Sequence, residues 1–107
     1  ELQNNLGLAN SRARLRMTSL YYFAGHYKSL VVGTGNKVED FGVGFYTKYG
    51  DGGVDISPIA DLLKSEVFSL GRYLKIDDKI LKAKPTDGLW DDNRTDEQQM
   101  GLNYDEI

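Results

Sequence analysis

Apolar side chains recur along residues 10–28 at alternating steps of four and three, the spacing of one face of an amphipathic helix. Asn10 or Ser11 can cap the start of this helix, because a short polar side chain accepts hydrogen bonds from the free backbone amides there. Residues 1–9 show little periodicity, and we expect a loop. The predicted apolar face consists of Ala13, Met17, Leu20, Ala24 and Tyr27.

A short apolar run at residues 30–32 follows the first helix and is rich in β-branched side chains. Such a run, closed by Gly33 and Gly35, is typical of a buried parallel strand. A helix that leads into a buried strand and then into a glycine-rich loop is an α/β pattern. The glycine-rich residues 41–57 are expected to be mostly loop, with a brief extended piece at residues 54–56.

A second helix is predicted from Ser57, which is a good N-cap, and Pro58, which suits the first helical position. It is expected to end at residues 75–77, and a short helix should then occupy residues 77–84, before Pro85. The apolar face of the second helix would consist of Ile59, Leu63, Val67, Leu70 and Leu74. The tail, residues 86–107, is acidic and polar around Trp90, Leu102 and Tyr104.

Composition excludes several classes of protein. The chain has 107 residues, a net charge of -3 and no cysteine. Disulfides, cysteine catalysis and thiolate metal sites are therefore excluded, which fits a reducing cytoplasm. The charge argues against a nucleic-acid partner, and no apolar run approaches the ~20 residues that span a membrane. Since the first residue is Glu1, we expect the chain to begin inside a longer protein.

The loop from Gly33 to Lys37 lies where open α/β sheets bind ligands, beyond the carboxyl end of a strand. The loop matches neither the Walker A motif GxxxxGK[ST] nor the GxGxxG motif. Taken by itself, it is slightly more typical of an ordinary tight turn than of a ligand-binding loop. Glu39 and Asp40 follow it. Carboxylates beside a phosphate site can hold Mg²⁺, whereas a solvated acidic pair is the better interpretation in isolation.

Residues 47–55 combine Lys48, Asp51 and Asp55 with several glycines. A binding loop is slightly favoured over a surface hairpin, because such a flexible segment is costly to order without a purpose. We expect residues 48–55 to lie beside the strand that ends at Gly33.

Three further polar residues are candidates with plainer alternatives. Lys64 could reach a phosphate, although an exposed helical lysine is favoured by spacing alone. The Thr86 hydroxyl could meet a ligand, although a plain turn is the commoner case. Arg14 shares a helix face with Asn10 and offers a guanidinium fork for phosphate or carboxylate. The flanking Arg12 and Arg16 are expected to be solvated.

Taken in order, these segments resemble the ammonia-dependent NAD synthetases from about Asn10 to the last residue. The segments that carry the resemblance are NSRARLRM, VVGTGNK, GFYTKYGDGGVDISPIADLLKSEV, KPTDGLW and TDEQQMGLNYDEI. The resemblance implies a cytoplasmic homodimer of the ATP-pyrophosphatase superfamily. Its fold would be a Rossmann-like (adenine nucleotide alpha hydrolase-like) parallel sheet with flanking helices, of which residues 1–107 form the central-to-C-terminal portion of a single domain.

The resemblance also implies a ligase that forms a carbon–nitrogen bond. Such an enzyme uses ATP and Mg²⁺ to adenylate the carboxylate of deamido-NAD, and ammonia then displaces AMP to give NAD. The residues implied are Lys48 and Asp55 as catalytic, Arg14, Lys48 and Asp55 for deamido-NAD, Thr34, Lys64 and Thr86 for ATP, and Glu39 for the metal. Counting back from Lys48 instead places Asp40 at the metal position.

Two departures from the family pattern affect these expectations. PTDGLW stands where the family has PTADLW, and the S-G-G-x-D-S loop that grips the pyrophosphate is absent from the chain. The 107 residues alone are therefore not expected to synthesise NAD. Two alternatives stay open: the synthetase domain of a glutamine-dependent NAD synthetase, and a non-catalytic nucleotide-binding or dimerisation module.

Overall fold

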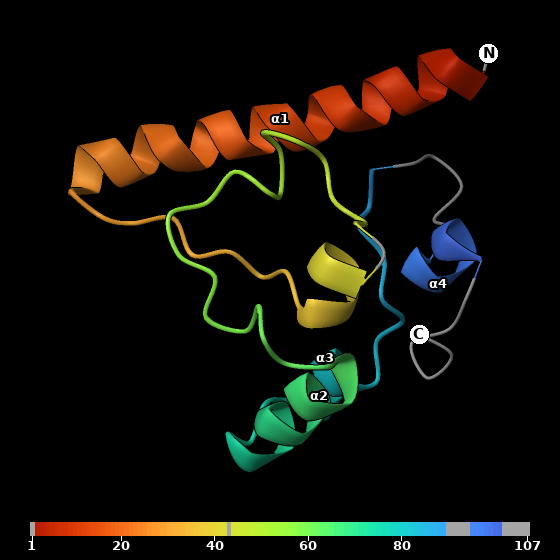
Figure 1. The fold of residues 1–107 in the computed structure, drawn as a ribbon. Coiled ribbons are helices and arrows are strands. Elements are labelled where there is room, and N and C mark those ends of the chain that lie inside the picture. The colour runs from red at the N-terminus through yellow and green to blue at the C-terminus, as the bar shows by residue number, and fades with distance from the viewer. Residues whose placement is uncertain (1, 43, 90–94, 102–107) are drawn as a thin grey trace.

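The computed structural model describes residues 2–42, 44–89 and 95–101, so the predicted role of Trp90, Leu102 and Tyr104 in the tail lies outside the described residues. A long helix runs along one side of the molecule, loops and short helices occupy the middle, and another pair of short helices lies on the far side (Figure 1). The helices are α1 (Leu2–Tyr27), the π-helix η1 (Val38–Gly42), α2 (Lys64–Tyr73), α3 (Asp78–Leu81) and α4 (Asp96–Met100).

Helix α1 begins at Leu2, so the prediction of a loop over residues 1–9 is wrong. The extra turns are anchored by Ala9, which is buried against Ala13 and Leu89 in the core cluster. A contact with a residue so distant in the chain outweighs the weak local preference. On the predicted apolar face, Leu20 and Tyr27 are exposed, whereas the alanines are buried.

Residues 30–33 run parallel to residues 54–56, and both segments are extended, as predicted. Val32 and Ile56 form an isolated parallel bridge, and the Gly33 amide donates to the Ile56 carbonyl over 2.7 Å. Val31 is buried, but Leu30 and Val32 are exposed, so the expected burial of this strand holds for one residue in three. No longer strand occurs in the described part of the chain, and the parallel sheet itself stays a prediction.

Helix α2 begins at Lys64, and the predicted start at Ser57 and Pro58 is wrong. Residues 58–62 form turns instead, and the Lys37 amide donates to the Leu62 carbonyl over 3.0 Å, which holds this segment to the loop after the bridge. The cap comes from inside the helix: Glu66 accepts a hydrogen bond from the Leu63 amide at 2.9 Å. Of the predicted face, Ile59 and Val67 are half-buried, whereas Leu63, Leu70 and Leu74 are exposed.

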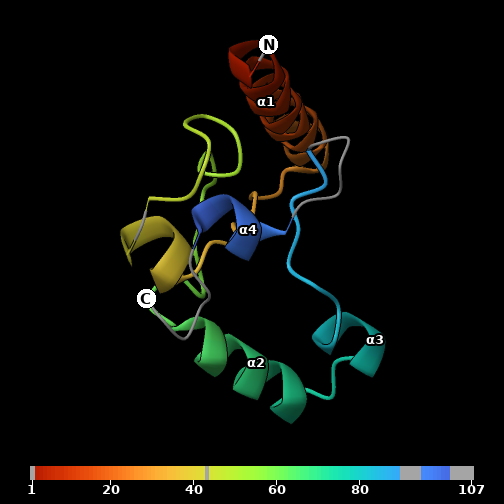
Figure 2. The same cartoon turned by 90° about the vertical axis from the view of Figure 1, so that its right-hand side faces the viewer.

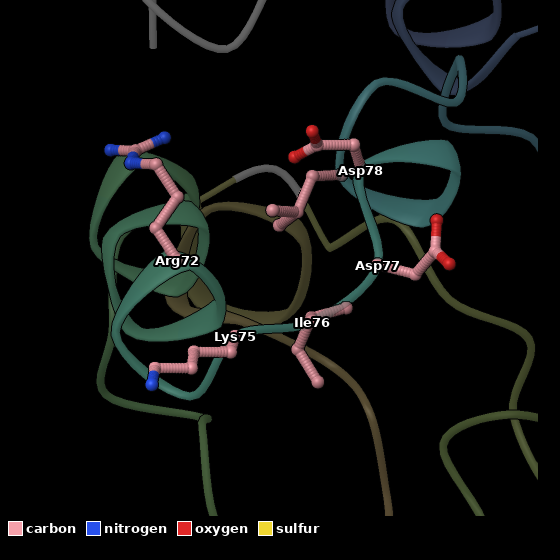
Figure 3. A pocket seen from close by; sticks show the side chains of 6 residues that line it. Arg72, Lys75, Ile76, Asp77 and Asp78 are labelled. Atoms are coloured by element: carbon pink, nitrogen blue, oxygen red, sulfur yellow. The ribbon is translucent and has the colours of Figure 1, made fainter.

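The end of α2 is a Schellman motif with a lysine in the left-handed position. Lys75 has φ 58°, and the Ile76 amide donates back to the Gly71 carbonyl over 3.0 Å. The chain then turns into α3, where the Asp77 carboxylate caps Lys79 at 2.8 Å, in agreement with the predicted short helix. A hollow of about 460 Å³ opens between α2 and α3 (Figure 3), lined by Arg72, Lys75, Ile76, Asp77, Asp78 and Leu81.

Helix α4 lies in the tail, where no helix was predicted. Its start carries a reciprocal capping box: the Thr95 hydroxyl accepts from the Gln98 amide at 3.2 Å, and the Gln98 side chain accepts from the Thr95 amide at 2.8 Å. The T-x-x-Q spacing was the signal for it. None of the helices described is both long enough and apolar enough to cross a membrane.

Candidate functional site

Two separate loops, residues 47–53 and residues 86–89, contact opposite flanks of helix α1. Asn10, Arg14 and Met17 project to one side of Ala13, whereas Arg12 and Arg16 project to the other, because each residue advances about 100° around a helix. Figure 2, which looks nearly along α1, shows the green-yellow loop on one side of the helix and the blue segment on the other. The two flanks therefore position different parts of the candidate site.

Arg12 and Arg16 fasten the segment that contains the predicted ATP residue Thr86. Arg12 donates to the Leu89 carbonyl over 2.6 Å, and Arg16 donates to the carbonyls of Asp87 at 2.9 Å and Gly88 at 3.3 Å. The expectation that both arginines are merely solvated is wrong. Both arginines donate to backbone carbonyls. Because every residue has such a carbonyl, the sequence could not predict these partners. In the turn that they hold, the Thr86 hydroxyl accepts from the Gly88 amide at 3.3 Å.

The turn at residues 47–53 is fastened to the opposite flank. Arg14 Nε donates to the Lys48 carbonyl over 3.1 Å, and the Thr47 hydroxyl donates to the Asn10 side chain over 3.1 Å. The backbone approaches α1 so closely that a Cβ at Gly50 would lie 2.9 Å from that of Ala13. Arg14 and Lys48 are thus neighbours, as their assignment to one substrate requires. The Lys48 side chain is exposed.

Asp55 joins three segments of the chain. Its carboxylate accepts from the Val31 amide at 2.8 Å. Desolvation, a hydrogen bond to Asp55 and the negative charge of Asp55 raise the pKa of Tyr21 on α1. The 54–55 end of the predicted binding loop therefore lies against the bridge, and a Cβ at Gly33 would lie 2.7 Å from Val54 Cγ2, which agrees with the expected adjacency. These contacts give Asp55 a structural role, and its contact with deamido-NAD stays a prediction.

The loop after the bridge is organised by Asn36, which is 1% exposed. Its side-chain oxygen accepts from the Glu39 amide at 3.1 Å, and its carbonyl accepts from the Asp40 amide at 3.0 Å, so Asn36 caps η1. A Cβ at Gly35 would collide with the Asp40 carboxylate unless that side chain rotated aside. Sequence analysis missed this role of Asn36, although an Asn three residues before Glu39 is a recognisable cap signal. Thr34, at the end of the bridge, is exposed.

Glu39 and Lys64 are brought together from η1 and the start of α2. Lys64 Nζ lies 3.4 Å from Glu39 Oε1, and the two side chains are only 20% and 15% exposed. The predicted metal residue and a predicted ATP residue are therefore in direct contact. Burial, followed by the charges of Glu39 and Asp51, raises the pKa of the neighbouring Asp40.

Asp96, at the start of α4, adds a carboxylate that sequence analysis missed. Burial raises its pKa to about 6, the charges of Glu39 and Asp87 add to the rise, and the charge of Lys64 opposes it. Its Oδ1 is buried and has no hydrogen-bond partner within the described residues. The Gln99 side-chain amide donates a hydrogen bond to the Asp87 carboxylate over 3.2 Å.

The charges that act on Asp96 are those of Glu39, Asp87 and Asp51, which raise its pKa, and that of Lys64, which lowers it. No three acidic or histidine side chains converge on one metal position in the part of the chain that the structure describes. None of the predicted site residues lines the hollow between α2 and α3, where Figure 3 shows acidic and basic side chains on opposite walls.

The fold and this arrangement correspond to a known class of protein. The family model described as NAD synthase matches residues 1–107. The chain belongs to the NAD synthase family.

Similar proteins agree with this family. The chain is 50% identical over 102 residues to an NH(3)-dependent NAD(+) synthetase of Carboxydothermus hydrogenoformans, covering 95% of this chain and 41% of that protein. It is 52% identical over 99 residues to one from Alkaliphilus metalliredigens, covering 92% of this chain and 39% of that protein. The chain thus spans about two-fifths of the length of these relatives.

Two solved structures also resemble the chain. An NMN synthetase from Francisella tularensis superposes with a TM-score of 0.85 at 47% identity, covering 92% of this chain and 40% of that one. An NH3-dependent NAD synthetase from Campylobacter jejuni, in complex with the nitrate ion, gives a TM-score of 0.69 at 40% identity, covering 72% and 33%. These neighbours are consistent with an α/β domain.

Proposed function

We propose that the protein carrying this sequence amidates deamido-NAD with ammonia at the expense of ATP. The carboxylate oxygen attacks the α-phosphorus and pyrophosphate leaves; ammonia then adds to the acyl carbon, loses a proton, and AMP leaves. The observation that carries this proposal is the contact between Lys64 and Glu39 at 3.4 Å, since these are the residues predicted to bind the phosphates of ATP and the metal ion. The names of the relatives support ammonia as the nitrogen source.

The acidic side of the site fits Mg²⁺. Carboxylate oxygens are its preferred protein ligands, and one or two suffice because phosphate and water oxygens complete the shell. Glu39 would hold the ion, with Asp40 the alternative. Burial and repulsion by the carboxylates of Glu39, Asp87 and Asp51 raise the pKa of Asp96, and this mutual repulsion favours a cation there. Bound Mg²⁺ would neutralise charge on the phosphates. Lys64 would bind the same phosphates, and the hydroxyls of Thr34 and Thr86 would position ATP.

The other flank of α1 fits deamido-NAD. The Lys48 ammonium is exposed on a turn whose backbone is fixed, so it can meet a carboxylate without moving the chain. Arg14 holds that turn through the Lys48 carbonyl and leaves part of its guanidinium fork for the dinucleotide. Asp55, which lies against Val31 beside the bridge, would also contact deamido-NAD.

We also propose that the protein acts as a homodimer, with α1 at the interface. Leu15, Leu20, Tyr22, Phe23 and Tyr27 leave large apolar surfaces exposed along this helix. Several large apolar side chains exposed on one helix suggest an interaction site. Light scattering on the complete protein should give twice the mass of one chain, whereas a monomeric mass would contradict the proposal.

The functional proposal is tested in the complete protein by measuring NAD formed from deamido-NAD, ATP, Mg²⁺ and ammonia. Lys48→Ala and Lys64→Ala should each lower kcat/KM by about 10²-fold or more, since each removes a charge that faces developing negative charge. Lys82→Ala, an exposed lysine just after α3, is the matched control and should keep full activity. Unchanged turnover in both site variants would instead support the non-catalytic module.

A second candidate is the synthesis of NMN by the same chemistry. The observation that favours it is the Francisella tularensis NMN synthetase structure, which is 47% identical. Nicotinate mononucleotide carries the same nicotinate carboxylate as deamido-NAD and lacks the adenylyl half. Comparing kcat/KM for the two substrates decides between the candidates.

A further inference from the structure

Tyr49 has a backbone conformation that its side chain disfavours. Its φ is 62°, in the left-handed region, where a Cβ crowds the neighbouring carbonyl. Glycine adopts this conformation freely and occupies the very next position. The Tyr49 side chain is 66% exposed, so burial of the ring does not explain why tyrosine occupies this position.

The surrounding contacts keep this conformation in place. Arg14 holds the Lys48 carbonyl, and the Asp51 carboxylate accepts from the Thr47 amide at 2.7 Å. The Gly50 amide donates to the Thr47 carbonyl over 2.9 Å, and Gly50 itself is packed against Ala13. The turn therefore fixes the backbone from which the Tyr49 ring projects.

The ring meets the side chain of the preceding residue. Lys48 Nζ lies 5.2 Å from the centroid of the Tyr49 ring, within the range of a cation–π contact. Such a contact restrains a long flexible side chain, which otherwise loses conformational entropy when a ligand orders it. It also leaves ammonium hydrogens free, because a ring face engages only one side of the cation.

We propose that Tyr49 is a positioning residue that holds the Lys48 ammonium ready for the carboxylate of the substrate. The inference rests on the proposed function, because Lys48 must face that substrate. The ring acts through Lys48, and removal of Lys48 should abolish its effect.

The test is steady-state kinetics of NAD formation by the complete protein with Tyr49→Gly, Tyr49→Phe and Tyr49→Leu. Tyr49→Gly and Tyr49→Leu should raise KM for deamido-NAD about 2- to 5-fold, the factor that an exposed cation–π contact represents, and leave KM for ATP unchanged. Tyr49→Phe keeps the ring face and should behave as wild type. Lys75→Gly is the matched control, because it relieves the same left-handed backbone (φ 58°) at the end of α2, and it should change neither KM.

The double variant Lys48→Ala/Tyr49→Gly tests whether Tyr49 acts through Lys48 or independently of it. If Tyr49 acts through Lys48, the double variant should have the same KM for deamido-NAD as Lys48→Ala alone. An equal 2- to 5-fold rise in the Lys48→Ala background would overturn the positioning role, as would unchanged KM in Tyr49→Gly or loss of function in Tyr49→Phe. If Lys48→Ala itself leaves NAD formation intact, the proposed function fails, which is a different result.

Discussion

Replacing Asp96 with asparagine should make the protein more stable at neutral pH and leave it unchanged in acid. The Asp96 carboxyl is buried beside other carboxylates, and its pKa is raised from 3.8 to about 6. The folded state therefore binds a proton that the unfolded state has lost between these two values. Stability falls as pH rises through that window and stays low above it.

The magnitude follows from the shift. A rise of about two pKa units corresponds to about 3 kcal/mol against the ionised form. Asp96 is only half-buried, and solvent screening reduces this to about 1 kcal/mol. Asparagine carries no charge at any pH, so Asp96→Asn escapes this cost.

The assay is the melting temperature of wild type and Asp96→Asn between pH 4 and pH 8, in EDTA so that no metal contributes. Above pH 7 the variant should melt about 2–4 °C higher, and the two curves should converge near pH 4. Asp78→Asn, at the exposed start of α3, is the matched control and should show no such pH-dependent gain. A variant that is equally or less stable than wild type at pH 8 would refute the reasoning about burial.

Two further predictions concern the loop that precedes η1. Gly35→Ala should destabilise the protein by about 1 kcal/mol or less, because the nearest atoms that its Cβ would meet belong to the Asp40 carboxylate, the end of a half-buried side chain that can rotate aside, and a loss of several kcal/mol would show that this carboxylate is held rigidly. Asn36→Ala should destabilise the protein by about 1–2 kcal/mol, since it removes a buried cap from the Glu39 amide. Because Glu39 is the predicted metal residue, the variant should also need a higher Mg²⁺ concentration for half-maximal activity. Asn36→Asp keeps the accepting oxygen but places a buried carboxylate beside Glu39 and Asp40, so at neutral pH it should not recover the lost stability.

The sequence predicted elements whose determinants are local. The two extended segments and the short helix before Pro85 were predicted because β-branching and proline act within a few residues, whereas the pairing of the segments and the Asp77 cap were not predicted. The start of α1 was missed because it depends on Ala9 meeting Leu89, 80 positions away in the sequence. The start of α2 was missed because strong cap signals at Ser57 competed with the bond from Lys37 to Leu62.

The candidate site was predicted as separate residues and not as an arrangement. Sequence could suggest Glu39 and Lys64 individually, but their contact depends on how η1 and α2 are placed. Helix spacing separated Arg14 from Arg12 and Arg16, but it did not predict that Arg12 and Arg16 donate to backbone carbonyls on the opposite flank. Asp96 lay in a tail that composition describes only as acidic.

The arrangement of two loops on one helix has a mechanical consequence. The turn of Lys48 and the segment of Thr86 are both tied to the middle of α1, on opposite sides of Ala13. A roll of this helix about its long axis would lift one loop while it lowers the other. A movement of the Lys48 turn and the opposite movement of the Thr86 segment would then be coupled through one rotation of α1.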